Sequence, residues 1–175
     1  MRSHARMAAV SAVSGVLLAV AVSGSAAAAA TSPVVGSSPV TLSYYVVSTG
    51  SNLYSANGQV VSDQNAQPAV GDYTVGTDND YAGTQASHSS EVAATDHLYC
   101  LITKAPATAT CSGQIAFPGG MLFSDNSNQD FSSNSATMNF PITGGTGAYQ
   151  GAHGNLVSTT IGNTNNSEFV ITVSK

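Results

Sequence analysis

Short runs of β-forming residues, each closed by turn residues, follow one another along most of this sequence. In the first run, from Thr41 to Ser48, Leu42, Tyr44 and Val46 would face one side of an extended strand. After the first thirty residues, no segment has the apolar spacing of an amphipathic helix. Eight or so short strands at regular spacing are typical of an all-β sandwich or barrel, and periodicity alone does not choose between the two.

The first thirty residues have the pattern of a secretory signal peptide. Arg2, His4 and Arg6 give a positive beginning, the stretch from Met7 to Val22 is apolar, and small residues follow up to Ala30. The alternative is a membrane anchor. However, the apolar stretch contains polar residues and falls short of the roughly 20 residues that a membrane-spanning helix needs. We therefore expect cleavage and secretion.

Removal of this peptide would leave one secreted domain. We expect a signal peptide over residues 1–30, a flexible arm over 31–40 and a single domain over 41–175. Two of the four basic residues would be lost and all nine acidic residues kept, which gives a net charge of −7. Such a surface repels phosphate backbones, so nucleic-acid binding is excluded as a function class. No later segment is apolar enough to cross a bilayer, so the mature protein should have no membrane association.

Two cysteines, Cys100 and Cys111, are the only ones in the chain. In an oxidising compartment they should form a disulfide across an antiparallel hairpin. This register places Leu98 opposite Gly113 and Ile102 opposite Ala109, with the turn at residues 104–107, which include a proline. A reactive thiol pair is the alternative, but the spacing is not C-x-x-C. The staple should contribute roughly 3 kcal/mol of stability.

A glycine-rich stretch, Ile142 to Gly154, reads ITGGTGAYQGAHG. It resembles the GGTG-x-(aromatic)-x-G-A-x-G signature of the allene oxide cyclase-like barrels, which the dirigent proteins share. The matching residues are Gly144, Gly145, Gly147, Tyr149, Gly151, His153 and Gly154. Weaker matches precede it, in order: Gly71-Asp72, Thr77-Asp78, Tyr81, Cys100 and Gly113-Gln114-Ile115. The resemblance implies an eight-stranded antiparallel β-barrel with a small, largely apolar lumen, and a homodimer or homotrimer.

Three departures from the family pattern bear on function. His153 stands where dirigent proteins usually carry an arginine, so the permanent forked cation is lost. The first strand, residues 41–48, lacks the acid and the amide that the plant cyclases place there. Their lumenal cysteine matches Cys100, which we expect to be in the disulfide. The plant cyclisation and lignan coupling are therefore not carried over to this chain.

The resemblance also suggests polar contacts. Asp78 falls where the cyclases use a lumenal asparagine, and a carboxyl group in an apolar barrel would have a raised pKa and could act as an acid or base. Asp72 and Tyr81 are the other two candidate catalytic residues. The alternative is that the Asp78 region is a solvated strand end. Candidate ligand contacts are Tyr44, Leu98, Ile102, Ile115 and Phe117. No metal or cofactor is expected.

Two functions follow from these features. The first is a secreted barrel that holds a small, partly apolar or phenolic molecule and steers or catalyses its cyclisation or coupling, with an isomerase- or cyclase-like activity if it is an enzyme. The second is a non-catalytic extracellular interaction or matrix protein. An open apolar cavity would favour the first function, and a barrel filled by its own side chains would favour the second.

Overall fold

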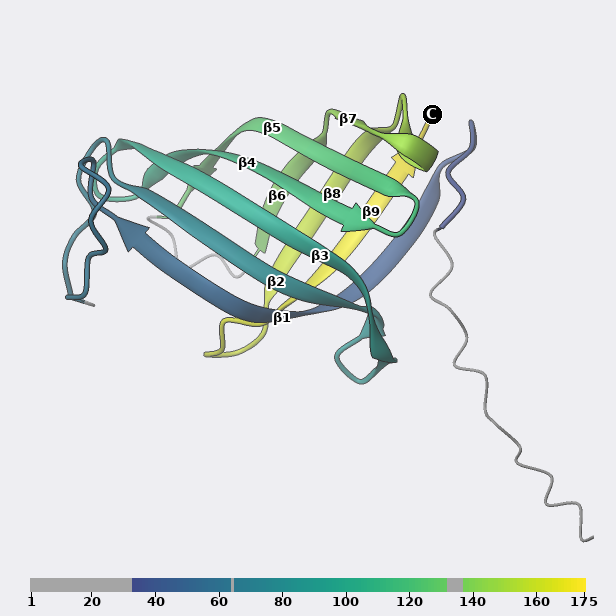
Figure 1. Cartoon of the computed structure of the whole chain (residues 1–175), viewed down its shortest axis with the longest axis horizontal. Coiled ribbons are helices and arrows are strands. Elements are labelled where there is room, and N and C mark those ends of the chain that lie inside the picture. The colour runs from purple at the N-terminus through teal and green to yellow at the C-terminus, as the bar shows by residue number, and fades with distance from the viewer. Residues whose placement is uncertain (1–32, 64, 132–136) are drawn as a thin grey trace, which may run out of the picture.

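Nine strands of one antiparallel sheet make up most of the described chain (Figure 1). This computed structural model describes residues 33–63, 65–131 and 137–175. The elements are β1 (Val40–Tyr54), β2 (Tyr73–Thr84), β3 (Ser87–Lys104), β4 (Thr108–Phe117), β5 (Gly120–Asp130), β6 (Thr137–Ile142), β7 (Gly144–Gly145), the single turn η1 (Gly147–Tyr149), β8 (His153–Thr160) and β9 (Ser167–Ser174). The expected signal peptide lies outside the described residues. No helix among those that are described is long and apolar enough to span a membrane.

The sheet closes into a barrel because its two outermost strands are neighbours along the chain. The strand order is β6-β8-β9-β1-β2-β3-β4-β5-β7, and only Thr143 separates β6 from β7. β6 pairs with β8 at one end of the order, and β7 pairs with β5 at the other. The structure therefore confirms the all-β barrel. It shows nine strands where eight were expected, because Thr143 interrupts what would otherwise be one strand.

Side chains complete the wall where β5 and β6 lie side by side without a backbone ladder. The Gln129 amide Nε2 donates a hydrogen bond to the Asn139 carbonyl at 2.7 Å and to the Ser127 hydroxyl at 2.6 Å. The Ser127 hydroxyl in turn donates to the same carbonyl at 3.3 Å. Gln129 is buried, so these bonds close the barrel from the inside.

The stapled hairpin is confirmed in its predicted register. Cys100 and Cys111 form the disulfide and face each other across β3 and β4. Leu98 lies opposite Gly113, and Ile102 lies opposite Ala109. Both cysteines are buried, so the side chains at every second position from them also point into the barrel. This register fixes which face of β3 and β4 is lumenal.

The glycine block shapes one end of the barrel. Gly147 has a φ of 56°, and a Cβ atom there would collide with the Gly119 carbonyl. The block therefore permits a tight approach that other residues would prevent. It places the Tyr149 ring, which is fully buried, 5.0 Å from the ring of Phe117. The Phe117 ring is 5.8 Å from that of Tyr44, so three aromatic side chains fill this end.

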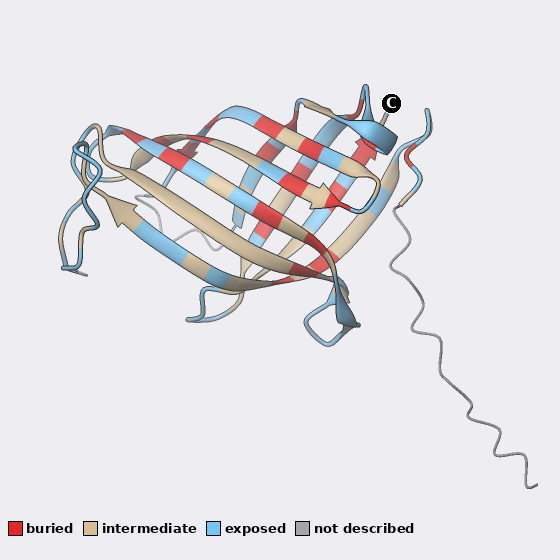
Figure 2. Cartoon of the chain, viewed as in Figure 1, coloured by how far each residue is buried: buried red, intermediate tan, exposed pale blue. Residues whose placement is uncertain are grey.

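Buried residues line the inside of the sheet at alternate positions (Figure 2). The chain before β1 contributes to the same core, because Val35 is buried and the Gly36 carbonyl accepts a hydrogen bond from the Lys175 backbone N–H. The expected domain start at residue 41 falls one residue inside β1. The aromatic end, η1 and the C-terminus thus lie together (Figure 1).

Candidate functional site

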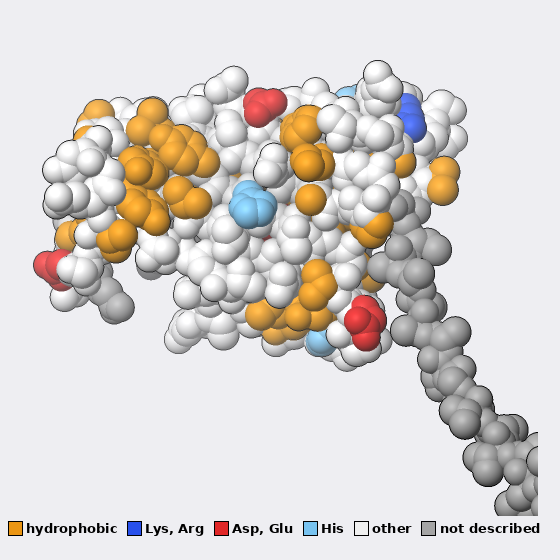
Figure 3. Space-filling model, in the orientation of Figure 1, with side chains coloured by type: hydrophobic (Ala, Val, Ile, Leu, Met, Phe, Trp, Pro, Cys, Tyr) orange, Lys and Arg blue, Asp and Glu red, His pale blue; other side chains and the backbone are white. Residues whose placement is uncertain are grey.

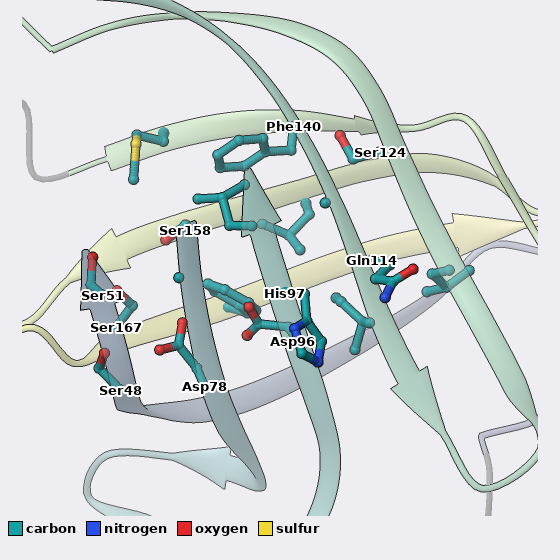
Figure 4. Close-up of a pocket in the computed structure, with 18 of the residues that line it drawn as sticks. Ser48, Ser51, Asp78, Asp96, His97, Gln114, Ser124, Phe140, Ser158 and Ser167 are labelled. Atoms are coloured by element: carbon teal, nitrogen blue, oxygen red, sulfur yellow. The ribbon is translucent and has the colours of Figure 1, made fainter. Parts of the chain in front are cut away.

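A cavity of about 290 Å³ lies inside the barrel, beyond the aromatic end. Its walls come from strands on all sides of the barrel and from the loop between β8 and β9. Nine large apolar residues line it: Leu98, Ile115, Leu122, Phe123, Met138, Phe140, Ile142, Leu156 and Phe169. The volume is near the lower end of the roughly 300–1,000 Å³ that is typical of small-molecule sites. The barrel is therefore hollow over part of its length (Figure 4).

Two aspartates form the acidic part of this wall. Asp78 on β2 and Asp96 on β3 lie directly opposite each other in the sheet, and both line the cavity. Asp80 faces the same side, one inward position closer to the aromatic end, and is completely buried. Asp96 is only 5% exposed. Three carboxyl groups thus share one region of an otherwise apolar lumen.

Asp80 and Asp96 behave as a coupled pair. Apart from the two carboxyl groups themselves, no donor in the described chain reaches either carboxyl oxygen of Asp80, or Oδ2 of Asp96. Each is the other's side-chain hydrogen-bond partner. Two acceptor groups can share a hydrogen bond only if one of them carries a proton. Burial, followed by repulsion from neighbouring carboxylates, raises the pKa of both groups well above the usual carboxyl value, so the pair retains a proton at neutral pH.

Asp78 is held differently from this pair. It is half-buried, and this burial raises the pKa of its carboxyl group. The Ser48 hydroxyl and the Thr49 backbone amide oppose the shift by hydrogen bonding to the carboxylate, and His97 opposes it electrostatically. Asp78 therefore keeps more of its ionised form than the buried pair does.

Hydroxyl groups supply the remaining polarity of the cavity. Ser48, Ser51, Ser158 and Ser167 gather near Asp78 (Figure 4). Ser124 on β5 lines the cavity as well; its Oγ atom is buried and has no hydrogen-bond partner within the described residues. The Ser124 hydroxyl and the Asp96 carboxyl are thus two buried polar groups that a lumenal molecule could satisfy.

The structure places only some of the predicted site residues at this cavity. Asp78, Leu98 and Ile115 line it. Three others point inward but pack in the core instead: Tyr44 and Phe117 at the aromatic end, and Ile102 beside the disulfide. The difference arises because inward-facing positions along one strand meet different neighbours across the barrel.

Asp72 and Tyr81 lie away from the lumen. The Asp72 carboxylate accepts hydrogen bonds from the backbone amides of Ala56 at 3.0 Å and Ala69 at 2.8 Å, which fixes the connection between β1 and β2. The Tyr81 ring lies 6.4 Å from that of Tyr45 and 5.8 Å from that of His88, in a cluster on the opposite face of β2 from Asp80. Neither side chain lines the cavity.

Asp80 and Asp96 were missing from the predicted site, although the sequence contained signals for both. Asp80 is two residues from Asp78 and so shares its strand face. Asp96 is four residues from Cys100, whose side chain the predicted hairpin turns inward. His153, the family departure, donates to or accepts from the Ser174 hydroxyl at 3.2 Å and is exposed. Within the described residues, no group of three or more His, Cys, Asp or Glu side chains is arranged to hold a metal ion.

The outer face of the same strands carries a second, shallower hollow, lined by His97, Gln114, Phe123 and Asp125, among others. Beside it, the Tyr54 ring stacks on that of Tyr73 at 5.1 Å, and the Tyr99 ring lies tilted 5.4 Å from that of Tyr73. Figure 3 shows hydrophobic side chains gathered near the left end of the visible face, which carries few charged side chains. His97 and Asp96 are consecutive residues, so they project to opposite sides of β3.

Comparisons with known proteins identify the fold. No protein-family model and no curated protein matches the chain. Among solved structures, the chain is similar to a pyocyanin demethylase, at 20% identity over 77% of this chain and 100% of that one, with a TM-score of 0.56. It is similar to AbnU, an exo-specific intermolecular Diels-Alderase, at 17% identity over 78% and 98% of the two chains, with a TM-score of 0.59.

A third similar structure is the pterocarpan synthase dirigent protein GePTS1, at 17% identity over 82% of this chain and 96% of that one, with a TM-score of 0.56. Similarity at these identities establishes the shared fold. The chain therefore shares the barrel fold of these structures, one of which is a dirigent protein.

Proposed function

We propose that this protein binds a small, partly apolar molecule in its lumen and steers or catalyses the cyclisation or coupling of that molecule. The observation that carries the proposal is the 290 Å³ cavity, which combines an apolar wall with buried carboxyl groups. An apolar site of this size can hold a flexible substrate in one conformer, and such fixation alone can supply a large part of a rate enhancement.

The carboxyl groups provide the chemistry that this site can add. The Asp80–Asp96 pair holds a proton at neutral pH, and Asp96 lines the cavity, so the pair can donate or accept a proton at a bound molecule. Asp78 stands opposite Asp96 as a second, more ionised carboxyl group. Groups whose environments separate their ionisation in this way are suited to acid and base roles.

The names of the similar structures point the same way. They include a Diels-Alderase and a pterocarpan synthase dirigent protein. The competing function, a non-catalytic interaction or matrix protein, is less well supported, because it predicts a barrel filled by its own side chains. Secretion remains part of the proposal and rests on the pattern of residues 1–30.

Native mass spectrometry of the mature protein, purified from its own culture supernatant, tests this function. We expect a bound small molecule at one copy per chain. A lumen-blocking variant, Gly76→Leu, should lose it. Gly76 lines the cavity, and a Cβ atom there would meet only the Leu98 Cβ, at 4.0 Å, so the new side chain can enter the hollow without backbone strain.

The matched control is Gly50→Leu on the neighbouring strand. A Cβ atom at Gly50 would lie 3.5 Å from the Thr77 hydroxyl, on the outer face, so this variant adds the same bulk outside the lumen. It should keep the ligand. An empty protein that also takes up no hydrophobic fluorescent probe would refute lumenal binding, as would equal retention by the two variants.

A further inference from the structure

The cavity is acidic, and no basic side chain lines it to balance the acids. Asp78 and Asp96 belong to its wall, Asp80 lies one inward position closer to the aromatic end, and no lysine or arginine is among the residues that line the cavity. His97 is the only other ionisable residue along the wall, but its ring projects to the outer hollow. A bound molecule would therefore meet carboxyl groups with no compensating protein cation.

Two polar side-chain atoms in this wall, Asp96 Oδ2 and Ser124 Oγ, are buried and could bond to a ligand. Asp96 is 5% exposed, and apart from the proton that it shares with Asp80, its carboxyl group has no donor from the described chain at Oδ2. Ser124, 7% exposed, likewise has no partner for its hydroxyl. A buried acceptor without a donor is costly, and a buried carboxylate is costlier still unless it is paired. A ligand that brings donor groups would remove this cost.

We propose that the natural ligand carries a positively charged nitrogen, such as a protonated amine, on an apolar frame. The nitrogen would lie against Asp96 and Asp78, and the frame would fill the apolar part of the cavity beside Phe140. This inference rests on the proposed function and narrows it to a chemical class. An anionic ligand is excluded because its charge would face three carboxyl groups at low local dielectric.

Binding of a cationic ligand should also change the protonation of the Asp80–Asp96 pair. Without a ligand the Asp80–Asp96 pair shares a proton, because two carboxylates so close together cannot both ionise. A cation beside Asp96 favours the ionised form, so its arrival should release the proton to solvent. A neutral ligand that accepts a hydrogen bond would instead keep the proton in place.

Three probes with one two-ring skeleton test the charge preference: naphthylmethylamine, naphthylmethanol and naphthoate. Isothermal titration at pH 7 should show the amine binding roughly ten- to a hundredfold more tightly than the alcohol, as expected for a charged hydrogen bond. Naphthoate should bind more weakly than the alcohol. Titration in two buffers with different heats of ionisation should show proton release with the amine and none with the alcohol.

Substitutions test whether the preference for the amine over the alcohol arises from the lumenal carboxyl groups. Asp96→Asn keeps the shape of the side chain and removes its charge, so it should bring the amine and the alcohol to within about threefold of each other. Glu91→Gln makes the same chemical change at an exposed position and should leave the preference intact. Circular dichroism checks that each variant is folded. Gly76→Leu should abolish binding of all probes.

The outcomes separate this inference from the function on which it rests. If the alcohol or naphthoate binds as tightly as the amine, and Gly76→Leu abolishes that binding, the charge assignment is overturned and lumenal binding stands. An unchanged amine preference in Asp96→Asn overturns the assignment as well. If no probe binds, or if Gly76→Leu makes no difference, both proposals fail.

Discussion

The filled end of the barrel and its hollow part are built from the same alternating strands. At the filled end, Tyr44 on β1 and Phe117 on β4 point inward, and the Phe117 ring packs against both Tyr44 and Tyr149 from η1. Farther along the same strands, the inward positions include Gly76 and Gly113, and a cavity remains. The comparison shows that the size of the inward side chains, together with the η1 turn that places Tyr149, decides where this barrel can hold a molecule.

The largest expected effect comes from truncating an aromatic ring in each region. Phe117→Ala should destabilise the protein by about 3–5 kcal/mol, because the ring is enclosed by other side chains. Phe140→Ala should cost about half as much, because one side of that ring already borders the cavity and loses fewer contacts. Urea unfolding of the two variants measures both values. Equal losses would mean that Phe140 is as tightly enclosed as Phe117.

The disulfide bounds the hollow part on the side away from the aromatic rings. Replacing both Cys100 and Cys111 by alanine should cost about 3 kcal/mol, the value expected for closing a short loop. The same unfolding experiment measures it, with the reduced wild-type protein as a control for the cavity that alanine leaves. A loss much below 1 kcal/mol would show that the hairpin is already ordered in the unfolded state.

Much of this comparison could be predicted from the sequence, and the limits have a physical origin. The cysteine spacing correctly predicted the register of β3 and β4, whereas the lumenal face follows from the burial of both cysteines in the structure. Ile115 and Phe117 share that face, yet one lines the cavity and the other fills the core. Strand periodicity reports the face of a side chain. It does not report what the side chain meets across the barrel, because that depends on residues from strands far apart in the sequence.

For the candidate acids, too, strand periodicity gives the face of a side chain but not its neighbours. The two-residue period of a strand puts Asp78 and Asp80 on one face, but the coupling of Asp80 with Asp96 depends on how β2 and β3 pair. Tyr81 was a candidate because of the family pattern, whereas the two-residue period places its ring outside with Tyr45 and His88. Strand pairing, more than residue type, decided which polar groups meet in the lumen.

The acidic pair should make stability depend on pH. A carboxyl group whose pKa is raised by folding contributes stability that is fully present below about pH 4 and is lost as the pH rises through the raised pKa. Asp96→Asn removes this linkage. It should match the wild type near pH 4 and become more stable than the wild type as the pH rises, by up to roughly 1.4 kcal/mol for each pH unit.

Thermal unfolding across pH 4 to 8 measures this dependence, with Glu91→Gln as the exposed control. Asp80 remains in the variant, and Asp78 and Tyr44 interact with it electrostatically, so a part of the slope should persist. A wild-type curve that is flat between pH 4 and 8 would contradict a shared proton.

The smallest expected effect is the change in stability when a glycine in each region is replaced by alanine. At Gly76, in the hollow part, a Cβ atom meets nothing closer than the Leu98 Cβ at 4.0 Å, so Gly76→Ala should stabilise the protein by about 0.5 kcal/mol through the unfolded state. At Gly145, beside the filled end, a Cβ atom would lie 2.5 Å from the Tyr149 carbonyl and 2.6 Å from that of Met121. The same change there must shift the backbone and should destabilise. Urea unfolding of both variants checks the sign at each site. Destabilisation by Gly76→Ala as well would mean that the lumen has no spare room beside Leu98, and the hollow part would then differ from the filled end only in its polarity.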